Sequence, residues 1–488
     1  MTRSIRGVGT VVATALLAAP LTAQHFPPER ELAAMIQQRV DEGRAVGLVL
    51  GVMEADGSTT VVAAGSAGPD ARPIGERTLF EIGSITKTFT AVLLADMARR
   101  EELDLTDPVA SLLPDGVRVP SRNGRRIALE DLSTHFSGLP RMPSNFDPAD
   151  PTNPYVDYTD DLLYEFLAEH ELRRDVGAEF EYSNVGVGLL GHALSLRVGD
   201  TYERVVRARI LDPLGMDMTG VVLRGDMLSW MAQGHDELGN VVSLWDLDVL
   251  VGAGGLRANV RDMLRYLAAN TGPPGSALEE AMRSTHVKRR EISAAVSIGL
   301  GWHVFDVGDA RIVAHSGGTG GFRTFIGFDP ELHVGTVILS NSRHGADDIA
   351  LHLLNPGLPL VERSVFHAGA IVVGALALLL GLAGFLTPTR LMGIAGRASS
   401  KRALFYAGTV ARGAAGVVLI LAAPTSRYPI GLIALGGLFV LAALAMPFVG
   451  LRRVQRLVDW WTERPSILTR LVSLGPVAVG LVILSWTL

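Results

Sequence analysis

The chain has 488 residues, of which 48% are hydrophobic and 19% are charged, and it contains no cysteine. That length allows roughly two to four domains, and the missing cysteine excludes disulfides, thiol nucleophiles and zinc–thiolate sites. The net charge of -6 is the sum of two unlike parts. Residues 365–488 hold 11 Lys and Arg against 2 Asp and Glu, whereas the preceding residues hold 33 against 48. This acidic first part excludes a basic, nucleic-acid-binding protein.

The N-terminus has the layout of a secretory signal. Two arginines precede an apolar run from Val8 to Leu17, and small residues continue to Ala23. A cut after Ala23 would place Leu21, rather than a small residue, three positions before it. Residues 1–23 are therefore predicted to be either a cleaved signal peptide or an uncleaved anchor. Both alternatives export the part of the chain that follows.

The exported part is predicted to begin with a helix over residues 28–43 and a hairpin. The hairpin strands, 47–54 and 59–65, meet at Asp56-Gly57, which is a strong turn signal. Loops and short helices broken by prolines then fill residues 100–290. The order of strands, helical middle and strands favours one α+β domain, an antiparallel sheet flanked by helices with a helical subdomain, over successive βαβ units. The late strands are predicted at 300–306, 311–315, 322–328 and 334–341.

The basic tail contains four apolar runs, each close to the ~20 residues that a helix needs to cross a bilayer. The first and third loops between them are rich in arginine, and the second has only Arg427. The positive-inside rule makes the first and third loops cytoplasmic, so the part before the tail lies outside, as a secretory signal also requires. The tail is predicted to be an all-α transmembrane domain over residues 361–488, with helices at 367–386, 403–423, 429–449 and 469–488.

Two features of the tail are not explained by membrane-spanning helices alone. Arg412 falls near the middle of the second run, where a charge costs ~2.5–3.5 kcal/mol. It either snorkels to an interface, marks a tilted span or has a functional role. Between the last two runs, apolar residues at helical spacing alternate with Arg452, Arg453 and Arg456. This pattern predicts a short helix on the anionic cytoplasmic leaflet.

Lysine is rare in this chain, which makes one lysine informative. Only Lys87, Lys288 and Lys401 occur among 44 basic residues, so arginine is used wherever a plain positive charge suffices. Arginine stays protonated in proteins, whereas a desolvated lysine can be neutral and act as a base. Gly83-Ser84 precedes a helical run, and Lys87 follows Ser84 by one turn on the same face. Lys87 can therefore take the Ser84 proton as the hydroxyl attacks a carbonyl, beside the positive end of a helix.

Two further motifs follow along the chain. Tyr182-Ser183-Asn184 lies in a polar turn before a Gly-rich apolar run, and His315-Ser316-Gly317-Gly318 ends a predicted strand. The order S-x-x-K, Y-S-N and H-S-G resembles the serine β-lactamase and penicillin-binding-protein superfamily, specifically the class C branch with its related esterases and D-amino-acid peptidases. The resemblance spans about residues 28–355 and implies a β-lactamase/transpeptidase-like fold for residues 24–360. Flanking phrases at 80–83, 132–140, 253–256 and 335–340 also fit.

The resemblance implies a role for each matching residue. Ser84 would be the acylated nucleophile, and Lys87 and Tyr182 would share the base and acid work. Asn184 would hydrogen-bond the substrate amide or Lys87. The backbone N–H groups of Ser84 and Gly318 would form the oxyanion hole. No metal or cofactor is implied.

The third motif departs from the β-lactamase pattern. His315 stands where that pattern has a lysine, so a permanent cation that helps to receive the β-lactam carboxylate is missing. With an ordinary pKa of ~6.5, His315 would be mostly neutral near pH 7. Ester or peptide cleavage is therefore favoured over efficient β-lactam hydrolysis. Gly317 and Gly318 would let the substrate lie against bare backbone, and His135 is interpreted as structural.

The sequence thus predicts a serine hydrolase in the bacterial cytoplasmic membrane, with its catalytic domain on the periplasmic face. Its partners would be the lipid bilayer and a small ester, amide or peptide substrate, and not nucleic acid. Two alternative functions remain open, a D-amino-acid-directed peptidase of the prodrug-cleaving type and a penicillin-acylated sensor. A transporter is disfavoured because the four runs carry so few charges. The chain contains neither the G-x-S-x-G nor the H-E-x-x-H motif of other hydrolases.

Overall fold

The computed structural model describes residues 24–68, 73–308, 310–361, 365–423, 426, 428–464 and 466–487. The predicted signal or anchor over residues 1–23 and Arg427 lie outside these ranges. The chain divides into two compact units, one ending at Leu358 and the other beginning at Pro359.

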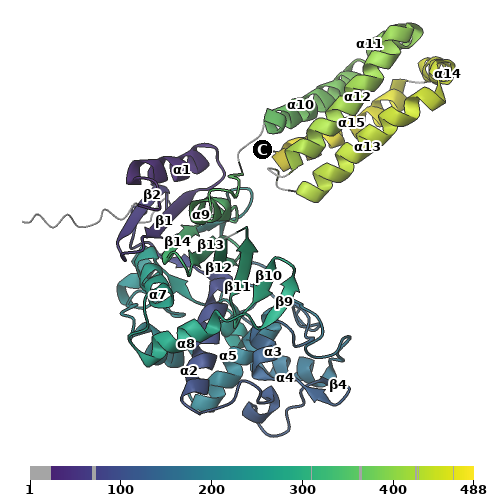
Figure 1. Ribbon diagram of the computed structural model, residues 1–488. Coiled ribbons are helices and arrows are strands. Elements are labelled where there is room, and N and C mark those ends of the chain that lie inside the picture. The colour runs from purple at the N-terminus through teal and green to yellow at the C-terminus, as the bar shows by residue number, and fades with distance from the viewer. Residues whose placement is uncertain are drawn as a thin grey trace, which may run out of the picture. The chain divides into compact units, whose positions relative to one another are not determined.

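An eight-stranded antiparallel sheet lies at the centre of the first unit (Figure 1). Its order is β2-β1-β14-β13-β12-β11-β10-β9, so the N-terminal hairpin pairs with the last strand of the unit. The hairpin and the four late strands are confirmed, while β9 and β10 extend the sheet beyond the prediction. The strands are β1 (Gly47–Met53), β2 (Thr59–Gly65), β9 (Arg290–Ser293), β10 (Val296–Ile298), β11 (His303–Val307), β12 (Ala310–Gly318), β13 (Arg323–Asp329) and β14 (Val334–Ser340).

Helices cover both faces of this sheet. On β14, a Cβ on Gly335 would point toward the side chain of Leu267 in α7 (Val260–Thr271). The hydroxyl of the next residue, Thr336, donates a hydrogen bond to the carbonyl oxygen of Ala350 in α9 (Asp347–Leu354). Neighbouring residues of a strand point to opposite faces, so α7 and α9 lie on opposite sides of the sheet. This explains why β1 and β14 are buried along their whole length and are apolar almost without a break.

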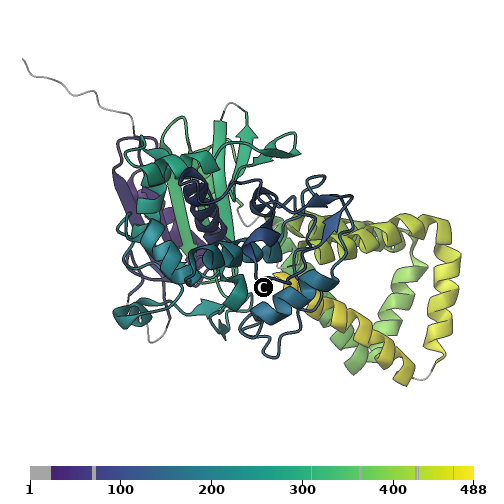
Figure 2. The same ribbon diagram turned by 90° about the horizontal axis from the view of Figure 1, so that it is seen from below.

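The most deeply buried helix is α2 (Thr86–Arg99), whose residues from Thr86 to Met97 are all buried. Figure 2 shows it, in dark blue, alongside the strands of the sheet. The other helices of the unit have 5 to 15 residues. In residues 100–290 several are short, as predicted, although one of them has 15 residues, one more than α2. Besides α7 and α9, these helices are α1 (Glu29–Asp41), α3 (Leu129–Ser133), α4 (Asp160–Glu169), α5 (Asn184–Val198), α6 (Tyr202–Val206) and α8 (Ala277–Thr285). Three small two-stranded sheets complete the unit: β3 (Phe80–Glu81) pairs with β8 (Arg257–Ala258), β4 (Ser121–Arg122) with β5 (Arg125–Arg126), and β6 (Gly234–His235) with β7 (Val241–Val242).

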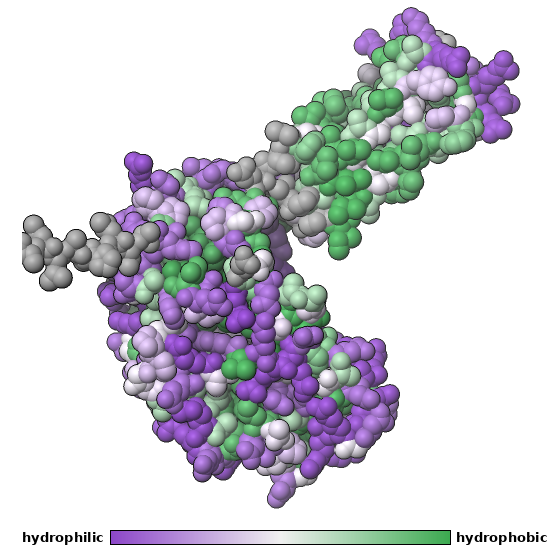
Figure 3. Space-filling model, viewed as in Figure 1, coloured by the Kyte–Doolittle hydropathy of each residue, from purple (hydrophilic) through white to green (hydrophobic). Residues whose placement is uncertain are grey.

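The second unit consists of helices. Four of them are long and apolar enough to cross a membrane, as the sequence predicts: Phe366–Leu386, Arg402–Ala422, Ile430–Val449 and Ser466–Thr487. Figure 3 shows hydrophobic residues over much of this unit and hydrophilic residues gathered at the end that carries α11 and α14. The predicted short helix is present as α14, and α11 is a helix that was not predicted. The helices are α10 (Val365–Leu386), α11 (Pro388–Ser400), α12 (Arg402–Ala422), α13 (Pro429–Val449), α14 (Leu451–Thr462) and α15 (Ser466–Thr487).

Small residues set the packing of this helical unit. A Cβ on Gly480 of α15 would lie 2.7 Å from the carbonyl oxygen of Gly374 in α10, and Gly416 of α12 meets Gly436 of α13 equally closely. Such glycines let apolar helices approach one another through backbone contacts. Arg412 is exposed on the surface of α12.

Candidate active site

The Ser84 hydroxyl lies at the entrance to α2. Ser84 sits in a 3-10 turn, Gly83–Ile85, that runs directly into the helix. Lys87, in the first turn of α2, is only 1% exposed. Its Nζ lies 2.9 Å from Ser84 Oγ and 2.6 Å from the carbonyl oxygen of Ala253. The predicted pairing of serine and lysine across one helical turn is thus present in the structure.

The surroundings of Lys87 favour its neutral form. Burial, and next the positive charge of Arg141, lower the pKa of Lys87 well below its ordinary value. A neutral amine has two N–H groups and one lone pair. Lys87 can therefore donate to the Ala253 carbonyl while its lone pair accepts the Ser84 proton.

Tyr182 faces the same serine from the chain segment before α5. Ser183 caps that helix, because its Oγ accepts a hydrogen bond from Gly186 N at 2.9 Å and donates to the Pro140 carbonyl. The centre of the Tyr182 ring lies 5.0 Å from Lys87 Nζ. Burial raises the pKa of Tyr182 to about 12, against the opposing effects of a hydrogen bond with Ser84 and the charge of Arg141.

His135 supports this segment, which fits its interpretation as structural. Its Nδ1 accepts a hydrogen bond from Ser183 N at 3.1 Å, and its ring centre lies 4.5 Å from that of Tyr182. Burial lowers the pKa of His135 well below its ordinary value, so the ring is neutral and can accept.

Asn184 begins α5 and faces the pocket without touching Lys87. Its Nδ2 contacts Met142 Sδ at 3.6 Å, and its buried Oδ1 has no hydrogen-bond partner within the described ranges. Of the two bonds implied by the resemblance, the one to Lys87 is therefore not formed in this structure. Lys87 uses the Ala253 carbonyl instead, and the Asn184 oxygen is left available to a ligand.

The third motif forms the end of β12, as predicted, and the strand continues beyond its predicted limit at residue 315 to Gly318. The two glycines are required for different reasons. A Cβ on Gly317 would lie 2.0 Å from the carbonyl oxygen of Ile82, so the protein's own backbone fills that side. A Cβ on Gly318 would have no atom closer than 3.7 Å. The backbone of Gly318 is thus open on this side, whereas close packing against the protein's own backbone explains Gly317.

Gly83 brings the serine turn against this strand. Its φ of 51° is in the left-handed region, and a Cβ there would lie 2.6 Å from Gly318 N. Only glycine satisfies both conditions without strain. The backbone of Gly318 is consequently held next to Ser84, where the predicted oxyanion hole requires it.

His315 is a buried neutral ring. Its Nδ1 lies 2.7 Å from the carbonyl oxygen of Ser316, and its ring centre lies 5.4 Å from that of His303. Burial, then the neighbouring His303 and Lys87, lower the pKa of His315 well below its ordinary value. His315 therefore supplies no permanent charge to the site near pH 7.

A narrow pocket of about 30 Å³ opens at Ser84. Two aromatic side chains, Tyr155 and Trp245, lie on its wall with ring centres 5.3 Å apart. Neither was identified from the sequence, because the loops that carry them are distant along the chain and meet only in the fold. The lining residues are Gly83, Ser84, Tyr155, Asn184, Trp245, Leu247, Leu250, Ala253, Gly254, Gly318 and Thr319.

Two arginines near the site were also missed. The guanidinium carbon of Arg141 lies 5.1 Å from the centre of the Tyr182 ring, and it has no acidic partner within 4 Å among the residues that the structure describes. Arg323 begins β13 directly opposite Gly318. Arg141 follows the family-like phrase at 132–140 immediately, which is a signal that could have pointed to it.

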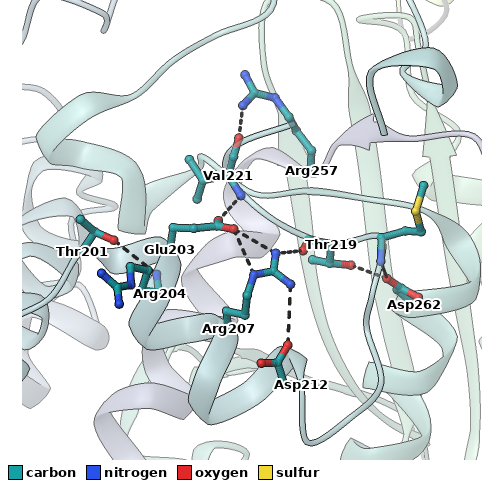
Figure 4. A network of polar contacts seen from close by, with 10 residues as sticks. Thr201, Glu203, Arg204, Arg207, Asp212, Thr219, Val221, Arg257 and Asp262 are labelled. Carbon is teal, nitrogen blue, oxygen red and sulfur yellow. Dashed lines mark hydrogen bonds and ion pairs between the residues drawn. The ribbon is translucent and has the colours of Figure 1, made fainter. Parts of the chain in front are cut away.

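A buried polar network holds the segment before Ser84. Glu81 of β3 accepts a hydrogen bond from Trp245 N at 2.7 Å and pairs with Arg257 of β8. Figure 4 shows that Arg257 also donates to the Val221 carbonyl, and that Val221 N donates to Glu203. This network therefore links the serine turn and the pocket wall to the helical subdomain.

The comparisons with known proteins agree with this geometry. A family model described as "Beta-lactamase" matches residues 32–355. A β-lactamase of Pseudomonas fluorescens is 27% identical over 315 residues, which are 57% of this chain and 84% of the relative. The D-alanyl-D-alanine-carboxypeptidase/endopeptidase AmpH of Escherichia coli K12 is 27% identical over 275 residues, which are 53% of this chain and 69% of the relative.

Solved structures share the fold. A class C β-lactamase from Rhodobacter sphaeroides superposes with a TM-score of 0.58 and 25% identity, over 67% of this chain and 98% of its own. A β-lactamase/D-alanine carboxypeptidase from Pseudomonas syringae gives a TM-score of 0.59 with 21% identity, over 68% and 99%. The fold and the site define a serine hydrolase with the β-lactamase/transpeptidase architecture. Since the family model matches more than half of the sequence, the chain belongs to the β-lactamase family.

Proposed function

We propose that this chain is a membrane-anchored, extracytoplasmic serine hydrolase that cleaves an ester or amide through an acyl ester on Ser84. The observation that carries the proposal is the position of Lys87. Its buried Nζ lies 2.9 Å from the Ser84 hydroxyl, and its pKa is lowered well below the ordinary value. Such an amine is a suitable base for a serine nucleophile.

Acylation would proceed in the following order. Ser84 Oγ attacks the substrate carbonyl carbon as Lys87 accepts the hydroxyl proton, and the backbone N–H groups of Ser84 and Gly318 stabilise the oxyanion. The tetrahedral intermediate then breaks its bond to the leaving group, which takes a proton relayed through Tyr182 and Lys87. Water attacks the acyl ester with the same two residues as base, and the acid product leaves Ser84 free.

The neutral His315 favours an ester or peptide as substrate over a β-lactam. A D-amino-acid-directed peptidase is the second candidate, because the similar proteins include AmpH of Escherichia coli, named as a D-alanyl-D-alanine-carboxypeptidase/endopeptidase. The Asn184 oxygen, buried and without a partner among the described residues, could accept a hydrogen bond from a substrate amide.

The four apolar helices support membrane anchoring. The arginine-rich first and third loops would face the cytoplasm by the positive-inside rule, which would place the catalytic unit outside. The hydrophilic end of the helical unit, with α11 and α14, would then meet the cytoplasmic leaflet.

The test combines labelling with turnover on the purified full-length chain. A serine-reactive fluorophosphonate should label the protein and not its Ser84→Ala variant. A panel of a p-nitrophenyl ester, a D-alanyl-D-alanine peptide and a β-lactam should give steady product release from at least one of the first two. Labelling at Ser84 without turnover of any substrate would favour the acylated sensor. Turnover that survives in Ser84→Ala would contradict the proposal.

A further inference from the structure

Two irregular loops from distant parts of the chain meet at the pocket of Ser84. Residues 141–157 contain several prolines and carry Tyr155, and residues 243–247 carry Trp245. The two rings lie 5.3 Å apart, centre to centre, and both belong to the pocket wall. The pocket has a volume of about 30 Å³, whereas small-molecule pockets usually have roughly 300–1,000 Å³. A substrate group of more than a few atoms therefore needs this wall to move.

Hydrogen bonds join the two loops directly. The side chain of Asn153 donates through Nδ2 to Asp246 Oδ2 at 3.2 Å, and its Oδ1 accepts from Asp246 N at 2.8 Å. Ser243 Oγ also donates to Thr152 Oγ1 at 3.3 Å. These bonds are exposed to solvent, and an exposed hydrogen bond contributes little net stability, so the loops can separate at small cost. The pair of Asn153 and Asp246 is called the latch below.

The two loops are held to the rest of the unit unequally. Trp245 is fixed through its backbone, because its N–H donates to Glu81 at 2.7 Å and its carbonyl accepts from Arg257 at 2.8 Å. Both partners are buried. The loop of Tyr155, in contrast, contains turns without a helix or strand, and its residues 149–152 are all exposed. Opening would therefore move the loop of Tyr155 away from a fixed Trp245.

We propose that Tyr155 and Trp245 form a gate that selects substrates by size, and that Asn153 is the positioning residue that holds this gate closed. This inference rests on the proposed function and adds the selectivity of the same site. Esters or amides with a small group at the pocket would react through the closed gate. Bulkier ones would react only while the latch is open, so their rates would be reduced by the open fraction.

The experiment measures access to the pocket without turnover. Because the chain has no cysteine, Ser84→Cys provides a single thiol in the pocket of the full-length protein in detergent. Its rates of reaction with benzyl and with methyl methanethiosulfonate are measured, and their ratio is compared with that of Ser111→Cys, an exposed position. The ratio of benzyl to methyl should be about 10-fold lower in the pocket. The added change Asn153→Ala should raise the benzyl rate about 3- to 10-fold and leave the methyl rate unchanged.

The matched control is Asp147→Ala, an exposed residue of the same loop that makes no hydrogen bond to the loop of Trp245 in the described chain. It should leave the ratio unchanged, whereas Trp245→Ala should bring the ratio close to that of the exposed thiol. A melting temperature close to that of the parent shows that each variant is folded.

Three results would overturn the gate: equal ratios in Ser84→Cys and Ser111→Cys, no reaction of Ser84→Cys with the methyl reagent, or a ratio that Asn153→Ala does not change. Because thiol exchange needs no hydrolysis, failure of the proposed hydrolase function is detected separately, by the substrate panel with Ser84 intact.

Discussion

At the scale of single residues, the site depends on which atoms surround one lysine. Lys87 Nζ has two close polar neighbours, the Ser84 hydroxyl and the Ala253 carbonyl, and no carboxylate pairs with it in the described chain. A buried, unpaired ammonium is costly, so the group loses its proton instead. The same environment that raises the pKa of Tyr182 to about 12 keeps the phenol protonated. A neutral base and a neutral acid therefore face one hydroxyl.

Lys87→Arg should abolish most of the activity. Arginine keeps the helix propensity but stays protonated, so it cannot act as a base near neutral pH. General-base catalysis typically contributes 10²- to 10⁴-fold, so kcat should fall by about that factor. Steady-state kinetics on the full-length protein measure it, with Lys288→Arg as the control, because Lys288 is in an exposed ion pair with Asp306. Nearly normal kcat in folded Lys87→Arg would refute the assigned base.

The pH profile should report the same group. The active form has neutral Lys87, so kcat/KM should rise with pH through the lowered pKa and reach its plateau well below pH 10. The charge of Arg141 is one cause of the lowering, hence Arg141→Gln should move this limb to higher pH. Arg126→Gln, an exposed residue of β5, should not move it. A limb that stays in place, or moves to lower pH, would show that another group is being titrated.

At the scale of elements, the turn before α2 determines the spacing between the nucleophile and β12. Gly83→Ala combines a left-handed φ of 51° with a Cβ only 2.6 Å from Gly318 N. Gly57→Ala is a matched control, because Gly57 has a φ of 81° and nothing within 4 Å of its Cβ. We expect Gly57→Ala to lower the free energy of unfolding by about 1 kcal/mol. Gly83→Ala should lower it by more, up to about 3 kcal/mol, and should also reduce kcat.

Denaturant unfolding of the two full-length variants, followed by tryptophan fluorescence, compares these effects. If both substitutions cost the same, the contact between Gly83 and Gly318 does not constrain the turn. If Gly83→Ala is destabilised but fully active, the position of Gly318 relative to Ser84 is not important for the chemistry.

The elements that the sequence predicts well are those with strong local patterns. The hairpin, the late strands and the start of α2 follow from turn residues and from a helical run without Gly or Pro. The strands β9 and β10 escape prediction because they have only four and three residues, which is too short for a periodic pattern to be recognised. The extension of β12 through Gly318 was missed because glycine normally weakens a strand. Here the sheet partners and the contact with Ile82 outweigh that preference.

The residues of the candidate site also fall into two groups, those that a sequence motif indicates and those that only the fold brings to the site. The residues Ser84, Lys87, Tyr182 and His315 belong to motifs, so the sequence could indicate them. Arg323 and Trp245 belong to no motif. They reach the site only because β13 pairs with β12 and because Glu81 holds the loop of Trp245 through its backbone N–H. Such long-range placement cannot be deduced from composition or spacing.

At the scale of the whole molecule, the alternating charges of the loops predict a defined orientation in the membrane. The absence of cysteine allows single cysteines to be introduced without background. Ser111→Cys in the catalytic unit and Tyr428→Cys in the second loop should react with a membrane-impermeant maleimide in spheroplasts. Leu457→Cys, exposed on α14, should react only after permeabilisation. Labelling of Leu457→Cys in sealed spheroplasts would contradict the orientation, whereas the catalytic chemistry would stand.

We propose that hydrolysis passes through an ester on Ser84. Its most direct test is mass spectrometry of the full-length protein quenched with acid during turnover of an activated ester. We expect a mass increase equal to the acyl group, located on Ser84 by peptide mapping, that forms and decays at rates compatible with kcat. The increase should be absent from Ser84→Ala. An acyl group on another residue, or hydrolysis that continues in Ser84→Ala, would contradict the claim.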